Sequence, residues 1–192
     1  MMYNTALKGG KNFTGAGASF AETTNGVVLK HDITDGQLPD AFRSADVIYS
    51  EPAWPTGLKV FNKRAGRQVD AQDYYDGLNR CIAELRVPAI MICGKSVSRR
   101  FTGYSSTLPT RLNGDSCIAY LWNIKLPRDL HTEMDILNYL VQHFNCILDP
   151  CCGYGRVGEV FNKESGKHFV MSDYDSKCVG YLKNKYENIS SK

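Results

Sequence analysis

Residues 146–161, CILDPCCGYGRVGEVF, decide how this chain is expected to fold. An apolar run ends at Asp149, a short loop with Gly153 and Gly155 follows, and a helical pattern opens at Arg156. Glycine lets a backbone approach a ligand closely, and the first N–H groups of a helix are free to bind one. The stretch therefore predicts a strand, a ligand-binding loop and a helix. A plain strand-to-helix turn is the simpler alternative.

The next strand strengthens the ligand-binding interpretation. Gly153, Gly155 and Gly158 stand in a GxGxxG-like frame, which is not a clean dinucleotide fingerprint. Residues 168–173 are expected to form the following strand, and its last residue, Asp173, lies 20 positions after Gly153. A carboxylate at this place in a βαβ unit accepts hydrogen bonds from ribose hydroxyls. The pattern therefore favours a ligand that contains a nucleoside.

Composition limits the class of protein. The 192 residues are 43% hydrophobic and 22% charged, which is typical of a soluble globular protein with one domain. No apolar run approaches the roughly 20 residues that span a bilayer, and the N-terminus lacks a signal-peptide core. Seven cysteines without a CxxC pair indicate neither a disulfide framework nor a metal site. A cytoplasmic setting is expected. The net charge of +3 permits a polyanionic partner without requiring one.

Short apolar strands alternate with helical patterns after an irregular, Gly-rich segment at residues 1–25. The remaining residues, 26–192, are expected to form a single domain. Strands are expected at 27–32, 47–51, 89–95, 117–124, 146–150 and 168–173, and helices at 70–86, 132–144, after Gly155 and at 176–186, with a short helix or turn at 38–44. This alternation predicts an α/β fold with an open, largely parallel sheet.

Two segments carry a resemblance to a known family. LDPCCGYGRVGEVF followed by GKHFVMSDYD resembles the LDPFxGSGTT and GRxFIGIE segments of S-adenosylmethionine-dependent amino methyltransferases that act on nucleic acids. VVLKHDITDGQLPDAFRSADVIYSEPAW (27–54) resembles the segment that leads to their catalytic (D/N/S)PP(Y/F/W) loop. The catalytic-type loop precedes the cofactor-type loop, which is the permuted order of the family's beta group. The resemblance spans roughly residues 27–190.

The resemblance implies a Rossmann-like methyltransferase fold. Its open, mostly parallel sheet would have about seven strands, a terminal antiparallel hairpin near residues 101–124 and a circularly permuted motif order. In the family's numbering of strands, the third, fourth and fifth would lie at 27–32, 47–51 and 89–95, and the first and second at 146–150 and 168–173.

The same resemblance implies a cofactor site and a catalytic loop. S-adenosylmethionine would rest on Asp149, Cys151, Gly153 and Gly155, with Asp173 on its ribose and Asp32 near its adenine. Glu51 would accept a hydrogen bond from the target amine, the Pro52 carbonyl would accept a second, and the ring of Trp54 would stack on the base.

The catalytic-type loop departs from the family pattern. Glu51 stands where the family has Asp, Asn or Ser, and its extra methylene moves the accepting oxygen. Ala53 replaces the second proline, which is expected to loosen the loop.

The cofactor-type segments depart as well. Cys151, Cys152 and Tyr154 replace the usual Phe and Ser residues. In HTEMD, which corresponds to HxxKP, Met134 and Asp135 replace Lys and Pro and remove a cation expected near the methionine carboxylate. Lys8, Lys11 and Arg156 are the candidates to replace that cation.

Residues 94–111 are the candidate nucleic-acid surface. Lys95, Arg99, Arg100 and Arg111 are interleaved with Phe101 and Tyr104, a mixture that suits phosphate contacts and base stacking. Arg99, Arg100, Phe101 and Tyr104 are therefore predicted to bind nucleic acid, and an ordinary solvated hairpin is the alternative. The span 96–130 is too short to add a target-recognition segment, so duplex sequence reading by this chain alone is not expected.

Several other side chains have structural explanations. Asp32 could cap a turn, and His131 is expected to be a cap or a surface residue. Tyr74 and Tyr75 are expected in the core and at its rim. Cys151 and Cys152 could serve as small apolar fill.

The sequence thus predicts an S-adenosylmethionine-dependent methyltransferase for an exocyclic amine, with adenine in DNA or RNA as the first choice. One alternative is a catalytically silent relative that binds cofactor or nucleic acid as a partner or regulator. Another is an enzyme that uses the same cofactor on a different substrate. A homodimer or a partner subunit would give a minimal domain more nucleic-acid surface.

Overall fold

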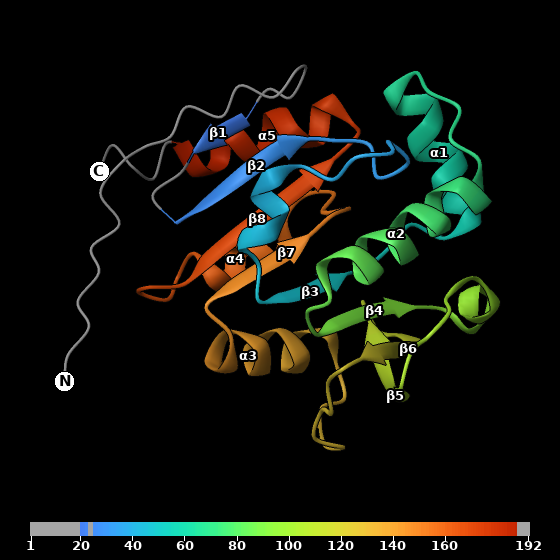
Figure 1. The fold of residues 1–192 in the computed structure, drawn as a ribbon, viewed down its shortest axis with the longest axis vertical. Helices are drawn as coiled ribbons and strands as arrows, with labels where there is room; N and C mark the ends of the chain where they lie inside the picture. Colours follow the sequence, from blue (N-terminus) through green and yellow to red (C-terminus); the bar gives the residue numbers. More distant parts are fainter. Residues whose placement is uncertain (1–19, 23–24, 188–192) are drawn as a thin grey trace.

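The structure is a computed structural model that describes residues 20–22 and 25–187. In this part of the chain, eight strands form one sheet in the order β1-β2-β8-β7-β3-β4-β6-β5 (Figure 1). The strands are β1 (Phe20–Glu22), β2 (Gly26–Lys30), β3 (Val47–Ser50), β4 (Ala89–Cys93), β5 (Ser106–Leu112), β6 (Asp115–Trp122), β7 (Cys146–Asp149) and β8 (His168–Asp173). The α-helices are α1 (Pro55–Ala65), α2 (Ala71–Leu85), α3 (Glu133–His143), α4 (Arg156–Phe161) and α5 (Ser176–Glu187), and the 3-10 helices are η1 (Asp40–Ser44) and η2 (Lys95–Arg100).

The centre of the sheet is parallel. Neighbouring strands pair in parallel along the series β2, β8, β7, β3 and β4. The β5–β6 hairpin is antiparallel and pairs with β4 through β6. β3 and β4 are buried along their whole length, as expected for strands that are covered by helices on both faces. The predicted open, mostly parallel sheet with a terminal antiparallel hairpin is confirmed.

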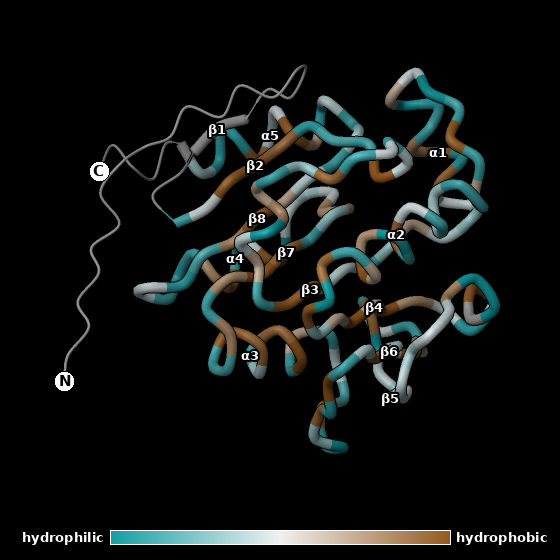
Figure 2. The backbone as a smooth tube through the Cα atoms, viewed as in Figure 1, coloured by the Kyte–Doolittle hydropathy of each residue, from teal (hydrophilic) through white to brown (hydrophobic). Residues whose placement is uncertain are grey.

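Helices cover both faces of the sheet, so the molecule has three layers and two cores. Side chains alternate between the faces: Val47 and Tyr49 belong to the core under α3, α4 and α5, and Ile48 to the core under α1 and α2. Figure 2 shows apolar residues along the central strands. Among the described residues, no helix combines the length and the apolar character needed to cross a bilayer.

Each predicted strand has a counterpart, but the strand β1 and the helices α1 and η2 were not predicted. Residues 20–22 form β1, which pairs antiparallel with Val27–Leu29, so the expectation of irregular structure is wrong there. Three residues are too few to show an alternating pattern, and the pairing with β2 supplies the stabilisation. The other expected irregular residues, 1–19 and 23–24, lie outside the described part.

Helix α1 was the second omission. Pro55 at its first position and Gly66 after its end, where φ is 66°, are recognised start and stop signals. Its sequence is otherwise unremarkable for a helix, with Gly57 in the first turn. Leu58 is buried in the core that α1 and α2 share, and this packing stabilises the short helix.

Gly77 of α2 allows close packing against the loop after β2. A Cβ atom at this position would lie 2.3 Å from the Ile33 carbonyl oxygen, a backbone atom that cannot rotate away. Gly77→Ala should therefore lower the free energy of unfolding by about 1–3 kcal/mol, measured by urea denaturation. Gly180→Ala in α5 is the matched control, because its Cβ meets open space and should stabilise by about 0.5–1 kcal/mol. Equal effects of the two variants would contradict the packing argument.

Candidate functional site

A pocket of about 460 Å³ opens at the carboxyl ends of β3, β7 and β8. β7 is the central strand of the three, with β8 on one side and β3 on the other. The chain leaves β7 through α4 toward β8, whereas it leaves β3 through α1 and α2 toward β4. The sheet order reverses between β7 and β3, and crevices at such points are the usual ligand sites of open α/β sheets.

The predicted cofactor loop forms one wall of the pocket. Gly153 and Gly155 adopt φ values of 52° and 79°, in the left-handed region that favours glycine. A Cβ at Gly155 would lie 2.4 Å from the Leu182 side chain, whereas a Cβ at Gly153 would meet open space. Gly155 is therefore favoured both by its left-handed conformation and by its close packing, and Gly153 leaves open space beside the loop.

Asp173 holds this loop against the end of β8. Its carboxylate accepts hydrogen bonds from the N–H groups of Gly153 at 2.9 Å and Asp175 at 2.8 Å. Burial raises the pKa of this carboxyl, although the two backbone donors oppose the shift. Asp173 lines the pocket. Its contact with a ribose remains a prediction.

Asp149 lies at the centre of the pocket and connects two strands. Its Oδ1 accepts from the Ser50 hydroxyl of β3 at 2.9 Å and from the Cys151 N–H at 3.2 Å. Burial raises the pKa of Asp149 to about 8, and both hydrogen bonds oppose that shift. Cys151 and Cys152 line the pocket beside it, and burial raises the pKa of both thiols. Cys152 is buried and Cys151 is half-buried, which agrees with small apolar fill.

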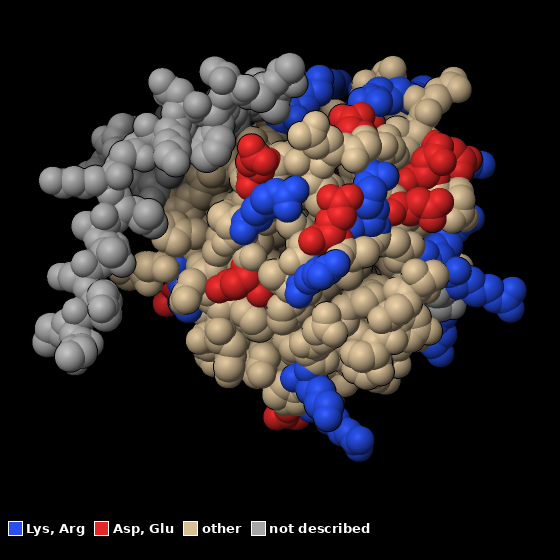
Figure 3. Space-filling model, in the orientation of Figure 1, with Lys and Arg blue, Asp and Glu red and all other residues tan. Residues whose placement is uncertain are grey.

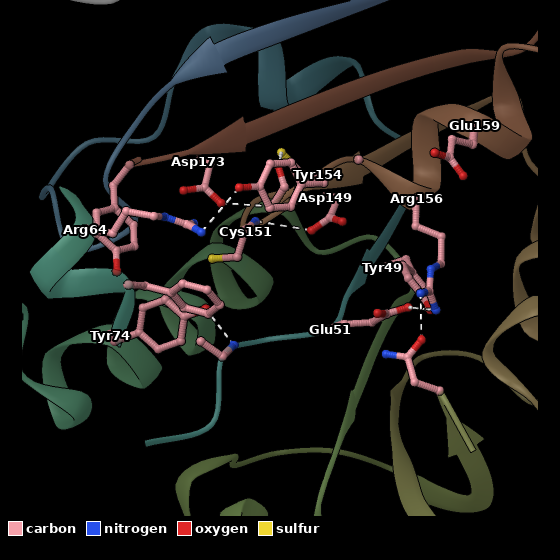
Figure 4. Close-up of a pocket in the computed structure, with 17 residues that line it drawn as sticks. Tyr49, Glu51, Arg64, Tyr74, Asp149, Cys151, Tyr154, Arg156, Glu159 and Asp173 are labelled. Carbon is pink, nitrogen blue, oxygen red and sulfur yellow. Dashed lines mark hydrogen bonds and ion pairs between the residues drawn. The ribbon is translucent and has the colours of Figure 1, made fainter. Parts of the chain in front are cut away.

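Glu51 lies at the opposite end of the pocket from Asp173 (Figure 4). The Tyr49 hydroxyl donates to its Oε1 at 2.6 Å, and Arg156 Nη1 is 3.8 Å from the same oxygen. Burial raises the pKa of Glu51, and the Tyr49 hydrogen bond and the Arg156 charge act in the opposite direction. The side chain remains 21% exposed, so its carboxylate can reach a bound molecule.

Arg156 is the cation at this end of the pocket. Its guanidinium donates to Glu133 at 2.6 Å and to Asn113, in the β5–β6 turn, at 2.8 Å. Of the three proposed replacements for the missing lysine, only Arg156 can be placed, because Lys8 and Lys11 lie outside the described residues. No local pattern in the sequence indicated the contributions of Asn113 and Glu133.

The segment HTEMD, which corresponds to HxxKP, forms the N-terminus of α3 and its cap. Thr132 and Asp135 form a reciprocal capping box, and the His131 N–H also donates to Asp135. The side chain of His131 is exposed, which confirms its prediction as a cap or surface residue. Met134 is 39% exposed and does not line the pocket.

Two tyrosines of α2 hold the backbone of Ala53. The Ala53 N–H donates to the Tyr74 hydroxyl at 3.2 Å, and the Tyr75 hydroxyl donates to the Ala53 carbonyl at 2.8 Å. The Tyr74 hydroxyl also interacts with the Cys151 thiol, so it links the Glu51 loop to the cofactor-type loop. Both tyrosines are buried, as predicted, but their hydroxyl groups also position this loop.

Pro52 and Trp54 complete the predicted catalytic loop. Pro52 is buried, whereas Trp54 is 36% exposed and precedes the first turn of α1. The indole packs against Gly94, where an added Cβ would lie 3.2 Å from the ring. Neither residue lines the pocket. Trp54 thus stands beside the pocket, and its stacking on a base remains a prediction.

Asp32 does not line the pocket. Its Oδ1 accepts from the N–H and the hydroxyl of Thr34 at 3.0 and 2.8 Å, and its Oδ2 pairs with Arg67 at 2.7 Å. These contacts agree with the turn-capping alternative. The contact of Asp32 with the cofactor adenine remains a prediction.

The predicted nucleic-acid segment is only partly accessible. Phe101 is 3% exposed and packs among Tyr75, Tyr120 and Trp122, so its predicted stacking on a base is wrong. The η2 segment contacts α2, and the ring that follows it is buried between α2 and β6. Arg100 donates to Gln72 at 2.9 Å and lies 5.6 Å from the Tyr75 ring centroid.

The other two residues predicted in that segment are accessible. Arg99 is exposed, and Tyr104 is 39% exposed with edge-on contacts to Tyr120 and Trp122. Their contact with nucleic acid remains a prediction.

Arg64 of α1 lies at the Asp173 end of the pocket and was not anticipated. Its guanidinium donates to Asp175, to the Cys178 sulfur at 3.2 Å and to the Tyr154 hydroxyl at 3.4 Å. It therefore fastens α1 to the start of α5 and to the glycine loop. The residue was missed because α1 itself was missed.

Comparisons with known proteins agree with this architecture. Neither the family models nor the curated proteins include a match to the sequence. The solved structure of the M1.HpyAVI–SAM complex has a TM-score of 0.54 and 10% identity, over 85% of this chain and 99% of that one. TTHA0409 of Thermus thermophilus, assigned as a DNA modification methylase, has a TM-score of 0.53 and 12% identity, over 85% and 94%.

The chain has a methyltransferase fold. TTHA0409 has also been solved with S-adenosyl-L-methionine, and that structure has a TM-score of 0.51 and 10% identity, over 83% of this chain and 92% of that one. At these identities the likeness concerns the fold. The expected Rossmann-like α/β methyltransferase architecture is thereby confirmed.

The Tyr74 hydroxyl should control the mobility of Ala53. Tyr74→Phe removes one hydrogen bond of about 1 kcal/mol, so exchange of the Ala53 amide hydrogen should accelerate roughly fivefold, measured by NMR. Tyr139→Phe in α3 is the control, because it removes a tyrosine hydroxyl from the core on the opposite face of the sheet. Similar acceleration at Ala53 in both variants would show a general loss of stability rather than a local restraint.

Asp149 should make stability depend on pH. Its folded pKa of about 8 exceeds the ordinary value of about 3.9, so the folded state holds the proton more tightly. The resulting stability is fully present below pH about 4 and is lost as the pH rises toward 8. The free energy of unfolding of the wild type should fall relative to Asp149→Asn across this window. Parallel curves for the two proteins would contradict the raised pKa.

Proposed function

We propose that this protein is an S-adenosylmethionine-dependent methyltransferase that acts on an exocyclic amine of a nucleic acid, with adenine in DNA or RNA as the expected base. The observation that carries the proposal is the single pocket that brings the Glu51 loop and the Gly153–Gly155 loop together. The fold, which M1.HpyAVI and TTHA0409 share, supports the same assignment.

The residues around the pocket fit this cofactor. A volume of about 460 Å³ lies within the usual range for small-molecule sites. Asp173 offers a carboxylate for ribose hydroxyls, and the open space beside Gly153 lets the cofactor approach the backbone. Asp149, Cys151 and Gly155 would complete that wall, and Arg156 would meet the methionine carboxylate. When bound, the cofactor supplies a methyl group activated by a sulfonium.

Glu51 is the residue proposed to serve the incoming amine. The reaction would move the methyl group from sulfur, which would keep the electron pair of the broken bond, to the amine nitrogen, which would become positively charged and need an acceptor for its proton. The ionised Glu51 carboxylate accepts a hydrogen bond from that nitrogen and can take its proton. Tyr49 fixes one Glu51 oxygen, and the Pro52 carbonyl is the second proposed acceptor. Trp54, at the edge of the pocket, is proposed to stack on the extruded base.

The order of the two loops supports a relationship to the beta group. In this chain the Glu51 loop precedes the glycine loop by about a hundred residues, yet the two meet because β3 and β7 are neighbours. The strands β2, β8, β7, β3 and β4 are neighbours in that order across the sheet. In the family's numbering they are the proposed third, second, first, fourth and fifth strands. A circular permutation accounts for this arrangement.

A catalytically silent relative is the second candidate, and Glu51 is the observation that favours it. The longer acid is already bonded to Tyr49 and faces Arg156, so its geometry differs from that of an Asp or Asn. Such a protein would bind the cofactor or nucleic acid as a partner or regulator. Calorimetry with S-adenosylmethionine, followed by mass spectrometry of nucleic acid after incubation, separates the candidates. Absence of cofactor binding would refute the leading proposal, and binding without methyl transfer would support the silent relative.

Glu51→Gln should lower methyl transfer by roughly 10²-fold, because the amide cannot take the amine proton. The wild-type rate should rise with pH as Glu51 loses its proton, at a pH above the ordinary range for Glu because its pKa is raised. This rise of the rate with pH should be absent in the variant. Affinity for S-adenosylmethionine should stay within a few-fold. Glu84→Gln on the exposed side of α2 is the control. An unchanged rate in Glu51→Gln would exclude Glu51 from the reaction.

A further inference from the structure

Helix α1 and the loop that follows it form a second hollow, which we call the α1 groove. Its volume is about 530 Å³, and it is lined by Lys59, Lys63 and Arg67 together with the polar side chains of Asn62 and Gln68. Val69 and Asp70 complete the lining. Three cations and two amides face one shallow space, a combination that suits the oxygens of a phosphate.

The groove is a built feature of the fold. Gly66, in the left-handed conformation, ends α1, and the N–H groups of Gly66 and Arg67 both donate to the Asn62 carbonyl. The Asn62 side chain in turn donates to the Val69 carbonyl at 2.8 Å. These bonds fold the loop back along the helix and fix the direction in which its side chains point.

Two of the groove's cations lack an intramolecular counter-charge. Lys59 and Lys63 are exposed and form no salt bridge with any residue in the described ranges. Arg67 pairs with Asp32, and the carboxylate of Asp70 caps the first turn of α2. Lys59 and Lys63 are four residues apart, about 6 Å along the helix, where like charges destabilise each other. A bound anion would relieve this repulsion.

The same helix borders the candidate active site. Phe61 and Arg64 of α1 line the pocket, Leu58 is buried in the core, and Lys59 and Lys63 face the groove. The helix begins directly after Trp54, the last residue of the Glu51 loop. A nucleotide whose base reaches that loop therefore has its neighbouring backbone close to α1.

Two of the four residues predicted at the surface around η2 are engaged within the protein. In the segment around η2, Phe101 is in the core and Arg100 is engaged by Gln72 and Tyr75. Arg99 and Lys95 remain exposed there. Figure 3 shows basic and acidic side chains interspersed over one face of the molecule, so general attraction of a polyanion by that face is weak. A local cluster such as the α1 groove can supply attraction that the mixed charges of this face do not.

We propose that the α1 groove binds the phosphate backbone of the nucleic-acid strand that presents its base to the Glu51 loop. This proposal rests on the proposed function for the identity of the partner. The contacts are made to phosphates, so they position the strand without reading its sequence. This agrees with the short connection from β6 to α3, residues 123–132, which adds no recognition domain.

The test measures binding of a fluorescent oligothymidylate with one central adenine, over a series of salt concentrations. Lys59→Gln/Lys63→Gln should weaken binding several-fold at low salt and lower the slope of log K against log salt by about 1.4, the value for two phosphates of a single strand. Lys95→Gln/Arg99→Gln removes the same charge from the rival surface. Lys125→Gln/Arg128→Gln, between β6 and α3, is the matched charge control.

The possible outcomes test phosphate binding by the α1 groove separately from the proposed methyl transfer. A larger loss in Lys59→Gln/Lys63→Gln than in both other pairs supports the α1 groove. An equal or larger loss in Lys95→Gln/Arg99→Gln, or no binding by the wild type, overturns it. Calorimetry with S-adenosylmethionine should give unchanged affinity in all three variants. A wild type that shows the groove effect but never methylates the adenine would retain this surface and refute the proposed enzymatic function.

Discussion

The parallel pairing of β7 between β3 and β8 is the constraint on which the site depends. It brings the last residues of three short strands to one edge, where Ser50, Asp149 and Asp173 come together. Ser50 bonds to Asp149 across β3 and β7, and Asp173 bonds to the loop that leaves β7. The side chains that form the pocket therefore also fix the strand ends, so its floor is a rigid part of the sheet.

This arrangement brings several buried carboxyl groups together at the pocket. Burial raises the pKa values of Glu51, Asp149 and Asp173, and the two arginines that line the pocket already have carboxylate partners. Such a site is costly for the apo protein, because each buried carboxyl is either protonated or poorly solvated. Groups with perturbed pKa values cluster at functional sites, because acids and bases that take part in a reaction need pKa values matched to their task. A ligand with positive charge, such as the proposed sulfonium, would offset part of this cost.

The sequence predicted the sheet better than the site. The short apolar strands and the loop at Gly153 have strong local signals, and they were found at nearly the right positions. Phe101 was misjudged because an aromatic among arginines looks the same whether the hairpin exposes it or folds it into the core. Arg64 and Asn113 reach the pocket from elements far away in sequence, and no local pattern encodes such contacts. Their roles follow from packing, which only the folded chain shows.

Hydrogen bonds with neighbouring tyrosines compensate for the departures of the catalytic-type loop from the family pattern. Replacing proline by Ala53 would loosen an isolated loop, but Tyr74 and Tyr75 bond both of its backbone groups. Tyr49 and Glu51 are two residues apart at the end of an extended strand, so their side chains point to the same side. The carboxylate of Glu51 meets the Tyr49 hydroxyl at 2.6 Å, and an Asp would withdraw it by about one carbon–carbon bond, roughly 1.5 Å. The length of the Glu51 side chain therefore matches the position of the Tyr49 hydroxyl. Different contacts hold this loop in place, and the loss of the second proline does not loosen it.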